Sequence, residues 1–335
     1  MKFLVGLLLL SLNVIASADD MMQPAIESQL ATKSLLLDIT NVNNEFMVAV
    51  GERGHIVRAT TTDSWQQMSV PTRHTLTSVT FADSKHGWAV GHGALILHTN
   101  DGGFTWHVQQ YLPETQKPLL DISFRNNQEG VAVGAYGMFF RTTDGGQNWQ
   151  QEFHVSLLPQ EDFDYLQELK KEDEAAYLDE RSSILPHFNR FYIDGRTSYL
   201  AGEFGLLAKS QDFGKTWQRL DDIYKGSFYD ISRTQAGNLL AVGLRGNVFR
   251  SLTNGTPWQH IATNHTALIN DILLAGEQHI LLVGNNGVML KSSDDGQSFS
   301  ALVQDDGKAL MAACLFRNSV VVASEAGIKV MQVKL

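Results

Sequence analysis

The sequence has little of several residue types, and each shortage excludes a class of structure or function. One cysteine, Cys314, occurs in 335 residues, so an internal disulfide or a zinc site built from several cysteines cannot form. Proline is scarce at seven residues while glycine reaches 28, which favours many tight turns and β structure. Basic residues number 26 against 36 acidic ones, and the net charge of −10 argues against a broad nucleic-acid surface.

Long apolar runs are also missing after the first residues. Lys2 precedes an apolar run over residues 3–12, and Ala16-Ser17-Ala18 matches a signal-peptidase site. We therefore expect residues 1–18 to be a signal peptide and residues 19–335 to form one exported domain. The run is too short to span a bilayer, and no later stretch approaches the roughly 20 apolar residues of a membrane helix.

One strand-like segment recurs seven times along the chain, typically as Ala-Val-Gly. The spacings between the last residues of the copies are 40, 43, 68, 41, 41 and 40. A unit of about 41 residues with four short strands is typical of a propeller blade. The sequence thus predicts an all-β fold, a seven-bladed β-propeller with four-stranded blades. The copies end at Gly51, Gly91, Gly134, Gly202, Gly243, Gly284 and, in a degenerate form, Ser324.

A polar turn with an aromatic residue follows in most units, with the pattern Ser/Thr-x-Asp-x-Gly-x-x-Trp. The carboxylate can accept hydrogen bonds from its own loop, glycine permits positive φ, and the ring packs back on the hairpin. The pattern resembles the Asp-box, or bacterial neuraminidase repeat, and we predict a structural role for its residues. These are Asp101 and Trp106, Asp144 and Trp149, Asp212 and Trp217, and Asp294 and Phe299.

Two segments depart from the repeat. The seventh blade runs out of chain after three strands, so we predict that residues 25–32 supply its outer strand and close the ring. The long spacing places an insertion at residues 153–186, between blades three and four. Residues 161–181 within it contain nine acidic and three basic residues, with apolar residues at helical spacing. We expect an acidic amphipathic helix, whole or broken in two, that is either a solvated decoration or a partner-binding element.

The turns between the second and third strands lie on the same face as this insertion. Exposed aromatic residues and arginines are typical interface anchors, so Arg53, Tyr136, Phe204 and Arg245 are candidate partner-binding residues. Tyr136 and Phe204 could equally well pack against the insertion. The full set of turn tips is Arg53, His92, Tyr136, Phe204, Arg245 and Asn286.

The spacing of the repeat predicts two more rings of side chains. The residue thirteen positions before the end of each repeated strand should lie near the central channel, where it could attract a cation or bond to the neighbouring blade. These residues are Asp38, Ser78, Asp121, Asn189, Asp230 and Asp271. The residue seven positions after the end of each repeated strand could cover the Asp-box aromatic ring, pair with the neighbouring blade, or bind an anionic partner. They are Arg58, His98, Arg141, Lys209, Arg250 and Lys291.

Enzyme motifs are missing: there is no G-x-S-x-G, no H-E-x-x-H and no phosphate-binding glycine loop. We expect no catalysis, no cofactor and no metal. A glycoside hydrolase with paired acids is the alternative, because Asp230, Asp271 or Glu203 could approach one another across the channel.

Gly130 to Trp149 has the pattern G-x-A-V-G-x-x-G-x-x-x-R-T-T-D-G-G-x-x-W. With the signal segment and seven blades, it resembles the photosystem II stability/assembly factor family over about residues 34–335. The resemblance implies a non-enzymatic factor that holds a newly made reaction-centre subunit through an arginine patch, here matched by Arg58, Arg141 and Arg250.

We therefore expect a monomeric assembly factor that binds a membrane-protein or envelope-complex subunit and no nucleic acid. It would lie in the periplasm, or in the thylakoid lumen of a photosynthetic host. In a non-photosynthetic host the resemblance implies an envelope or exporter accessory protein. A secreted propeller that binds or hydrolyses glycans is the alternative function.

Overall fold

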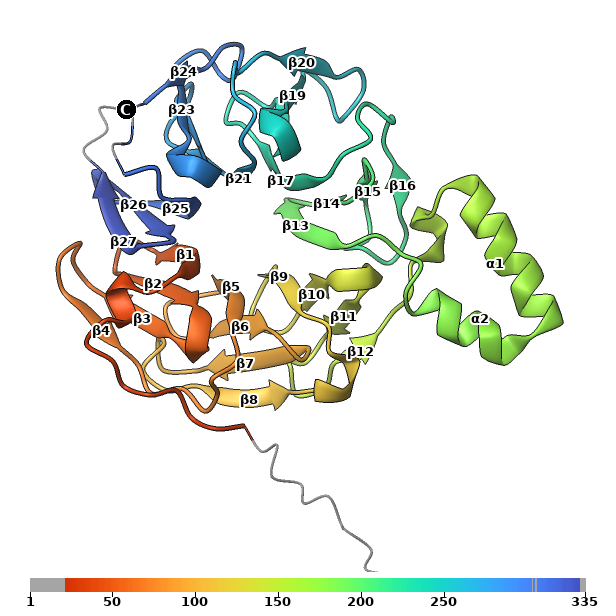
Figure 1. Ribbon diagram of the computed structural model, residues 1–335, viewed down its shortest axis with the longest axis horizontal. Coiled ribbons are helices and arrows are strands. Elements are labelled where there is room, and N and C mark those ends of the chain that lie inside the picture. The colour runs from red at the N-terminus through yellow and green to blue at the C-terminus, as the bar shows by residue number, and fades with distance from the viewer. Residues whose placement is uncertain (1–21, 303, 305, 332–335) are drawn as a thin grey trace, which may run out of the picture.

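The computed structural model describes residues 22–302, 304 and 306–331, and the predicted signal peptide at residues 1–18 lies outside them. Seven antiparallel sheets form a ring around a central channel (Figure 1). Six sheets have four strands, which follow one another in chain order from the channel outwards, and the seventh has three described strands. The predicted seven-bladed β-propeller is confirmed.

The first four blades contain strands β1 to β16. Blade one has β1 (Leu36–Val42), β2 (Phe46–Gly51), β3 (Ile56–Ala59) and β4 (Trp65–Gln67); blade two has β5 (Leu76–Phe81), β6 (Gly87–Gly91), β7 (Leu95–Thr99) and β8 (His107–Gln110). Blade three has β9 (Leu119–Phe124), β10 (Gly130–Gly134), β11 (Phe139–Thr142) and β12 (Gln150–Gln151); blade four has β13 (Phe188–Asp194), β14 (Thr197–Gly202), β15 (Leu207–Ser210) and β16 (Gln218–Arg219).

The last three blades contain β17 to β27. Blade five has β17 (Phe228–Arg233), β18 (Leu239–Gly243), β19 (Val248–Ser251) and β20 (Gln259–Ile261); blade six has β21 (Ile269–Leu274), β22 (Ile280–Gly284), β23 (Met289–Ser292) and β24 (Ser300–Ala301). Blade seven has β25 (Leu310–Phe316), β26 (Ser319–Ser324) and β27 (Gly327–Met331).

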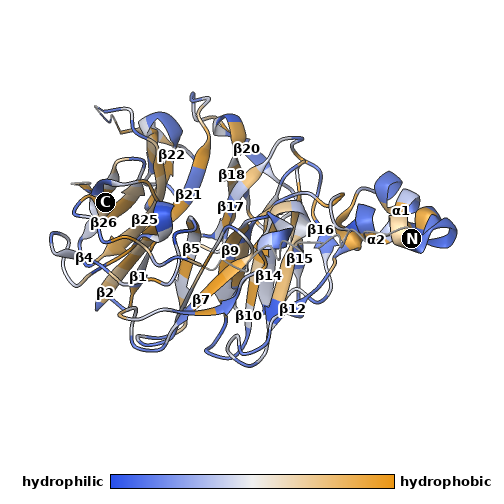
Figure 2. Ribbon diagram, turned by 60° about the horizontal axis from the view of Figure 1, so that its bottom comes forward, coloured by the Kyte–Doolittle hydropathy of each residue, from blue (hydrophilic) through white to orange (hydrophobic). Residues whose placement is uncertain are grey.

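The second strand of each blade is covered on both faces by neighbouring blades. Every residue of β10 and β18 is buried, which explains why these segments are continuous apolar runs rather than alternating ones. Figure 2 shows the hydrophobic colour concentrated on the strands and the hydrophilic colour on the loops. The core therefore lies between the blades, and the loops at the two faces are free to carry function.

The predicted closure by an N-terminal strand is wrong. Residues 25–32 contain no strand, and Ala31–Lys33 form a 3₁₀ turn, η1, that contacts β27. Before η1 the segment lies along blade one, where the Ala25 amide donates to the Val70 carbonyl at 2.9 Å. It meets blade seven at Gly327, where a Cβ would lie 1.9 Å from the Thr32 carbonyl oxygen. Its hydrogen-bonding groups are thus used by blade one and not by the edge of β27.

Contacts of the innermost and outer strands with their neighbours hold the ring together at this point. β1 of blade one packs against β25 of blade seven, and the Asn41 side-chain amide donates to the Leu315 carbonyl at 2.6 Å. Ala31 in η1 is buried in the same interface.

Deleting residues 22–33 is expected to lower the free energy of unfolding by about 2–4 kcal/mol, since buried apolar contacts and several hydrogen bonds are lost. Urea unfolding measures the change. The matched control replaces Ile26 and Leu30, which are 62% and 60% exposed, with serine, and it should unfold like the parent. Parent-like unfolding of the deletion itself would contradict the packing role of this segment.

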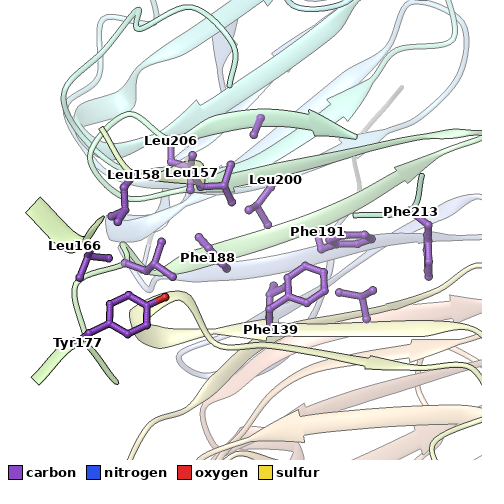
Figure 3. Close-up of a cluster of buried hydrophobic side chains, with 14 residues drawn as sticks. Phe139, Leu157, Leu158, Leu166, Tyr177, Phe188, Phe191, Leu200, Leu206 and Phe213 are labelled. Atoms are coloured by element: carbon purple, nitrogen blue, oxygen red, sulfur yellow. The ribbon is translucent and has the colours of Figure 1, made fainter. Parts of the chain in front are cut away.

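The insertion forms two helices, α1 (Gln160–Glu172) and α2 (Glu174–Arg181), which project from the outer edge of the ring beside blades three and four (Figure 1). Asp173 separates them and caps α2, its carboxylate accepting from the Ala176 amide at 3.0 Å. Leu166 and Tyr177 are buried against Phe188 of blade four (Figure 3). The apolar stripe therefore anchors the helices, while most of the acidic residues face solvent.

Within the described part of the chain, none of the helices has the length and apolar character needed to cross a membrane.

Candidate functional site

The Asp-box turns have the predicted hydrogen bonds. In the first, Asp101 Oδ1 accepts from the Phe104 and Thr105 amides, both at 3.0 Å, and the Trp106 indole donates to the Gly103 carbonyl at 3.1 Å. Burial alone would raise the pKa of Asp101, but its hydrogen bonds lower that pKa to about 2. Asp144, Asp212 and Asp294 accept amide hydrogen bonds from Asn148, Thr216 and Ser298 in the same way.

The aromatic residue of each turn packs inwards. Trp106 is 4% exposed and meets Phe81 edge to face. Trp149 and Trp217 make the same contact with Phe124 and Phe191, and Phe299 packs on the core between blades five and six. These contacts account for the Asp-box residues as elements of the fold.

Arg58, Arg141 and Arg250, here called the arginine arc, link consecutive blades. Each donates to the backbone carbonyl of the residue that follows the Asp-box aspartate of the next blade. Arg141 and Arg250 are each only 7% exposed. The Arg58 guanidinium lies 4.1 Å from the ring centroids of both Phe46 and Phe104. The donor–acceptor distances are 2.8 Å from Arg58 to Gly102, 2.7 Å from Arg141 to Phe213, and 2.8 Å from Arg250 to Asp295.

These contacts place the arginine arc between blades, as the structural interpretation of these residues expects. The side chains also have acidic partners, since Arg141 pairs with Glu152 at 2.6 Å and Arg250 pairs with Asp295 at 2.7 Å. A direct role of the arc in binding a partner stays a prediction.

Four aspartates of the channel ring bond to the next blade. Their carboxylates accept from backbone amides of the neighbouring first strand, so they hold adjacent blades in register. The bonds run from Val79 to Asp38 (2.8 Å), from Phe191 to Asp121 (2.8 Å), from Ile272 to Asp230 (2.9 Å) and from Ala313 to Asp271 (2.9 Å). The structural interpretation of this ring is confirmed.

The sequence argument missed the residue at the centre of the ring, Arg190. In blade four, Arg190 pairs with Ala201 one residue before the terminal glycine, as Asp121 pairs with Val133 in blade three. The β13–β14 hairpin is one residue shorter than those of blades one, two, three, five and six, so the position thirteen residues before Gly202 is Asn189 instead. Asn189 is displaced into a β-bulge, where its side chain donates to the Phe228 carbonyl at 2.8 Å. The short Gly195-Arg196 turn was the signal that could have corrected the register.

Arg190 forms ion pairs with three of the four aspartates. Its guanidinium nitrogens lie 3.1 Å from Asp230, 3.3 Å from Asp271 and 3.4 Å from Asp121. Burial alone would lower the pKa of Arg190, but the surrounding carboxylates raise it well above its ordinary value. Burial raises the pKa of Asp271, and the nearby charge of Asp230 raises it further, to about 7 despite Arg190. One positive charge therefore faces four carboxylates.

The turn tips lie on the face of the ring opposite the Asp-boxes, where one mouth of the channel lies. We call Arg53, Tyr136, Phe204 and Arg245 the tip ring. All four are exposed, Phe204 by 72% and Tyr136 by 44%, and all have positive φ between 52° and 58°. The next residue must be glycine, since a Cβ on Gly54 would lie 2.0 Å from the Thr72 carbonyl oxygen.

Only one of the two aromatic tips packs against its surroundings. The Tyr136 ring meets His187 edge to face at 4.7 Å and lies 5.0 Å from Lys117 Nζ. Lys117 in turn donates to the Ser182 carbonyl at the end of the insertion. Phe204 is exposed to solvent, so of the two alternatives left open for it, packing against the insertion is wrong.

A cavity of about 330 Å³ opens at this mouth, with Arg190 and Asp38 among its lining residues. Arg190 also lines a second cavity, of about 310 Å³, together with Ser123 and Ser232. Ser123 lies two residues after Asp121 on β9, and Ser232 lies two residues after Asp230 on β17, so both are nearer to the Asp-box face. Arg190 therefore borders both cavities.

Comparison with known proteins gives a consistent result. The family model described as photosynthesis system II assembly factor YCF48 matches residues 57–161. The photosystem II assembly protein Ycf48 of Thermosynechococcus vestitus is 28% identical over 241 residues, or 71% of this chain and 62% of that protein. The photosystem II assembly lipoprotein Ycf48 of Picosynechococcus sp. is 31% identical over 236 residues, or 69% and 61%. The chain is similar to the photosystem II assembly factor family over these residues.

Solved structures of this family share the fold of the chain. A structure described as YCF48 bound to D1 peptide has a TM-score of 0.68 and 19% identity, and it covers 92% of this chain and 98% of that one. YCF48 from Cyanidioschyzon merolae has a TM-score of 0.67 and 16% identity, with 89% and 95% covered. The chain spans about three fifths of the length of the curated family members it matches first. Those members are named as assembly factors and not as enzymes.

Proposed function

We propose that this protein is a non-catalytic assembly factor that binds a segment of a membrane-protein subunit at the tip ring. Similarity to the photosystem II assembly factor family supports the proposal, and so does the solved relative described as bound to a D1 peptide. Several relatives are named lipoproteins, which supports an exported location. In a host without photosystem II, the corresponding partner is a subunit of an envelope complex.

The single observation that favours the tip ring is its exposure. Phe204 and Tyr136 present aromatic surface to solvent on the same face as two exposed arginines, and both residue types are common interface anchors. Arg141 and Arg250 of the arginine arc are buried and already bonded to the next blade. The tip ring can therefore meet a partner without breaking a contact of the fold.

The channel chemistry supports a role without turnover. Asp230 and Asp271 share Arg190, and each accepts a backbone amide hydrogen bond from the next blade. Glu203 accepts from the His187 amide at 3.2 Å. A hydrolase needs one free acid and one free base at a substrate, and these carboxylates are committed to the fold. The glycan-hydrolase alternative is not favoured.

The test measures capture of pulse-labelled membrane subunits from detergent-solubilised host membranes by the tagged protein. We expect the parent to retain a newly made subunit, and Phe204→Ser combined with Arg245→Gln to reduce retention at least tenfold, because both anchors are lost. Leu252→Ser is the matched control, since Leu252 is 67% exposed and follows β19 on the Asp-box face. Loss of capture by Arg58→Gln but not by the tip variant would transfer the site to the arginine arc.

A further inference from the structure

The wall of the cavity at the channel mouth is built by one repeated distortion. The first strand of every blade has a register shift just before its channel-ring residue, and the extra residue turns its side chain towards the mouth. In blades two, four and six this residue is polar and bonds across to the next blade. The bonds run from Thr77 to the Leu119 carbonyl, from Asn189 to Phe228 and from Asn270 to Leu310, at 2.7 to 2.8 Å.

The other blades contribute apolar side chains at the same position. Leu37, Leu120, Tyr229 and Met311 come from blades one, three, five and seven, and all four line the cavity. The amide and hydroxyl groups between them are already bonded to the neighbouring blades. A ligand therefore meets a largely apolar collar whose threonine and asparagine side chains are already bonded to the neighbouring blades.

The floor below the collar is negative. Asp38 lines the cavity, and its carboxylate is held by the Val79 amide and the Ser78 hydroxyl. Arg190 pairs with the other three aspartates, so Asp38 has no ion-pair partner within the described part of the chain. Glu203 at the rim adds a further carboxylate, opposite His187 at 3.5 Å. Asp38 and Glu203 are therefore the two carboxylates of this cavity that can attract a cation.

From this geometry we infer that the channel mouth is a pocket for one basic side chain, lysine or arginine, of the protein partner. The aliphatic stem lies against Leu37, Leu120 and Met311, and the charged end reaches towards Asp38. This division of an apolar stem and a cationic head matches the collar and the floor. The inference rests on the proposed function and specifies the chemistry of the partner segment that crosses the tip ring.

The experiment uses the purified protein and blocked nine-residue glycine–serine peptides that differ only in a central lysine, arginine, norleucine or glutamate. Calorimetry or NMR titration should give at least tenfold tighter binding for the two basic peptides than for the norleucine peptide. Met311→Lys places a cation in the collar and should abolish the preference. Leu252→Lys, the same change at an exposed apolar residue on the Asp-box face, should leave it intact.

A second variant keeps the test decisive if Met311→Lys unfolds the ring. Asp38→Asn keeps the shape of the floor and removes its charge, and it should weaken the basic peptides three- to tenfold while leaving the norleucine peptide unchanged. Equal binding of norleucine, or tighter binding of glutamate, would overturn the inference. If membrane subunits are still captured in that case, the pocket assignment fails and the assembly-factor function stands. If no subunit is captured, the proposed function fails whatever the peptides show.

Discussion

Arg190→Met is expected to lower the free energy of unfolding by about 3–5 kcal/mol at pH 8, because removing one partner of a buried charge network leaves the other charges uncompensated. Methionine keeps most of the aliphatic volume, so the loss reports the guanidinium and not a cavity. Asp121, Asp230 and Asp271 each lose an ion pair in this variant. Urea unfolding at several pH values measures the effect.

The pH dependence of the same variant has a definite sign. The pKa of Asp271 is raised to about 7 in the folded protein, so the folded state binds a proton more readily than the unfolded chain. The contribution of this group to stability is therefore fully present below its ordinary pKa near 4 and is lost as the pH rises through 7. Burial also raises the pKa of Asp38 and Asp230, which adds to this trend.

Arg190→Met should accordingly be much less destabilising at pH 5 than at pH 8, because the carboxylates can be neutralised by protons. Adding Asp271→Asn to the variant should recover part of the stability at pH 8 and flatten its pH dependence. A loss of the same size at both pH values would mean that Arg190 acts through packing alone.

The propeller could be predicted from the sequence because every blade has the same buried strand and most have the same polar turn. The second strand is buried on both faces, so it is a continuous apolar run that ends in glycine, and the Asp-box adds a second marker at a fixed distance. The outer strands were less predictable, since β12, β16 and β24 have only two residues each. Strands this short leave no alternation to detect.

Two predictions are wrong because they were based on residue spacing along the repeat, while the structure is decided by hydrogen bonds. The hairpin of blade four is one residue shorter than those of five other blades, which moves the channel position from Asn189 to Arg190, the only guanidinium in the described ring. The N-terminal segment was assigned to the open edge of blade seven, although blade one takes its hydrogen bonds. Both outcomes depend on contacts between blades, which a repeat alignment within one chain does not contain.

The residues of the candidate site could be predicted from the sequence, but their hydrogen-bond partners and their burial could not. The tip ring could be predicted because every tip comes after a strand that ends in glycine. Its exposure could be predicted because each tip lies on a turn. The arginine arc was readable as a pattern, but the acceptor of each guanidinium is a carbonyl some 44 to 72 residues away. Burial of these side chains could be learned only from the packed ring.

Trp106→Ala should lower the free energy of unfolding by about 3–5 kcal/mol, the usual cost of truncating a buried indole to a methyl group. The side chain is 4% exposed, packs in the core between blades one and two, and closes its own turn through the Gly103 carbonyl. Phe104→Ala in the same turn is the control. That ring is 53% exposed and lies over Arg58, so its loss should cost under about 1 kcal/mol. Urea unfolding of both variants separates the two roles: equal losses would mean that the turn is held by its surface stacking, whereas a large loss for Trp106 alone shows that the Asp-box aromatic joins adjacent blades.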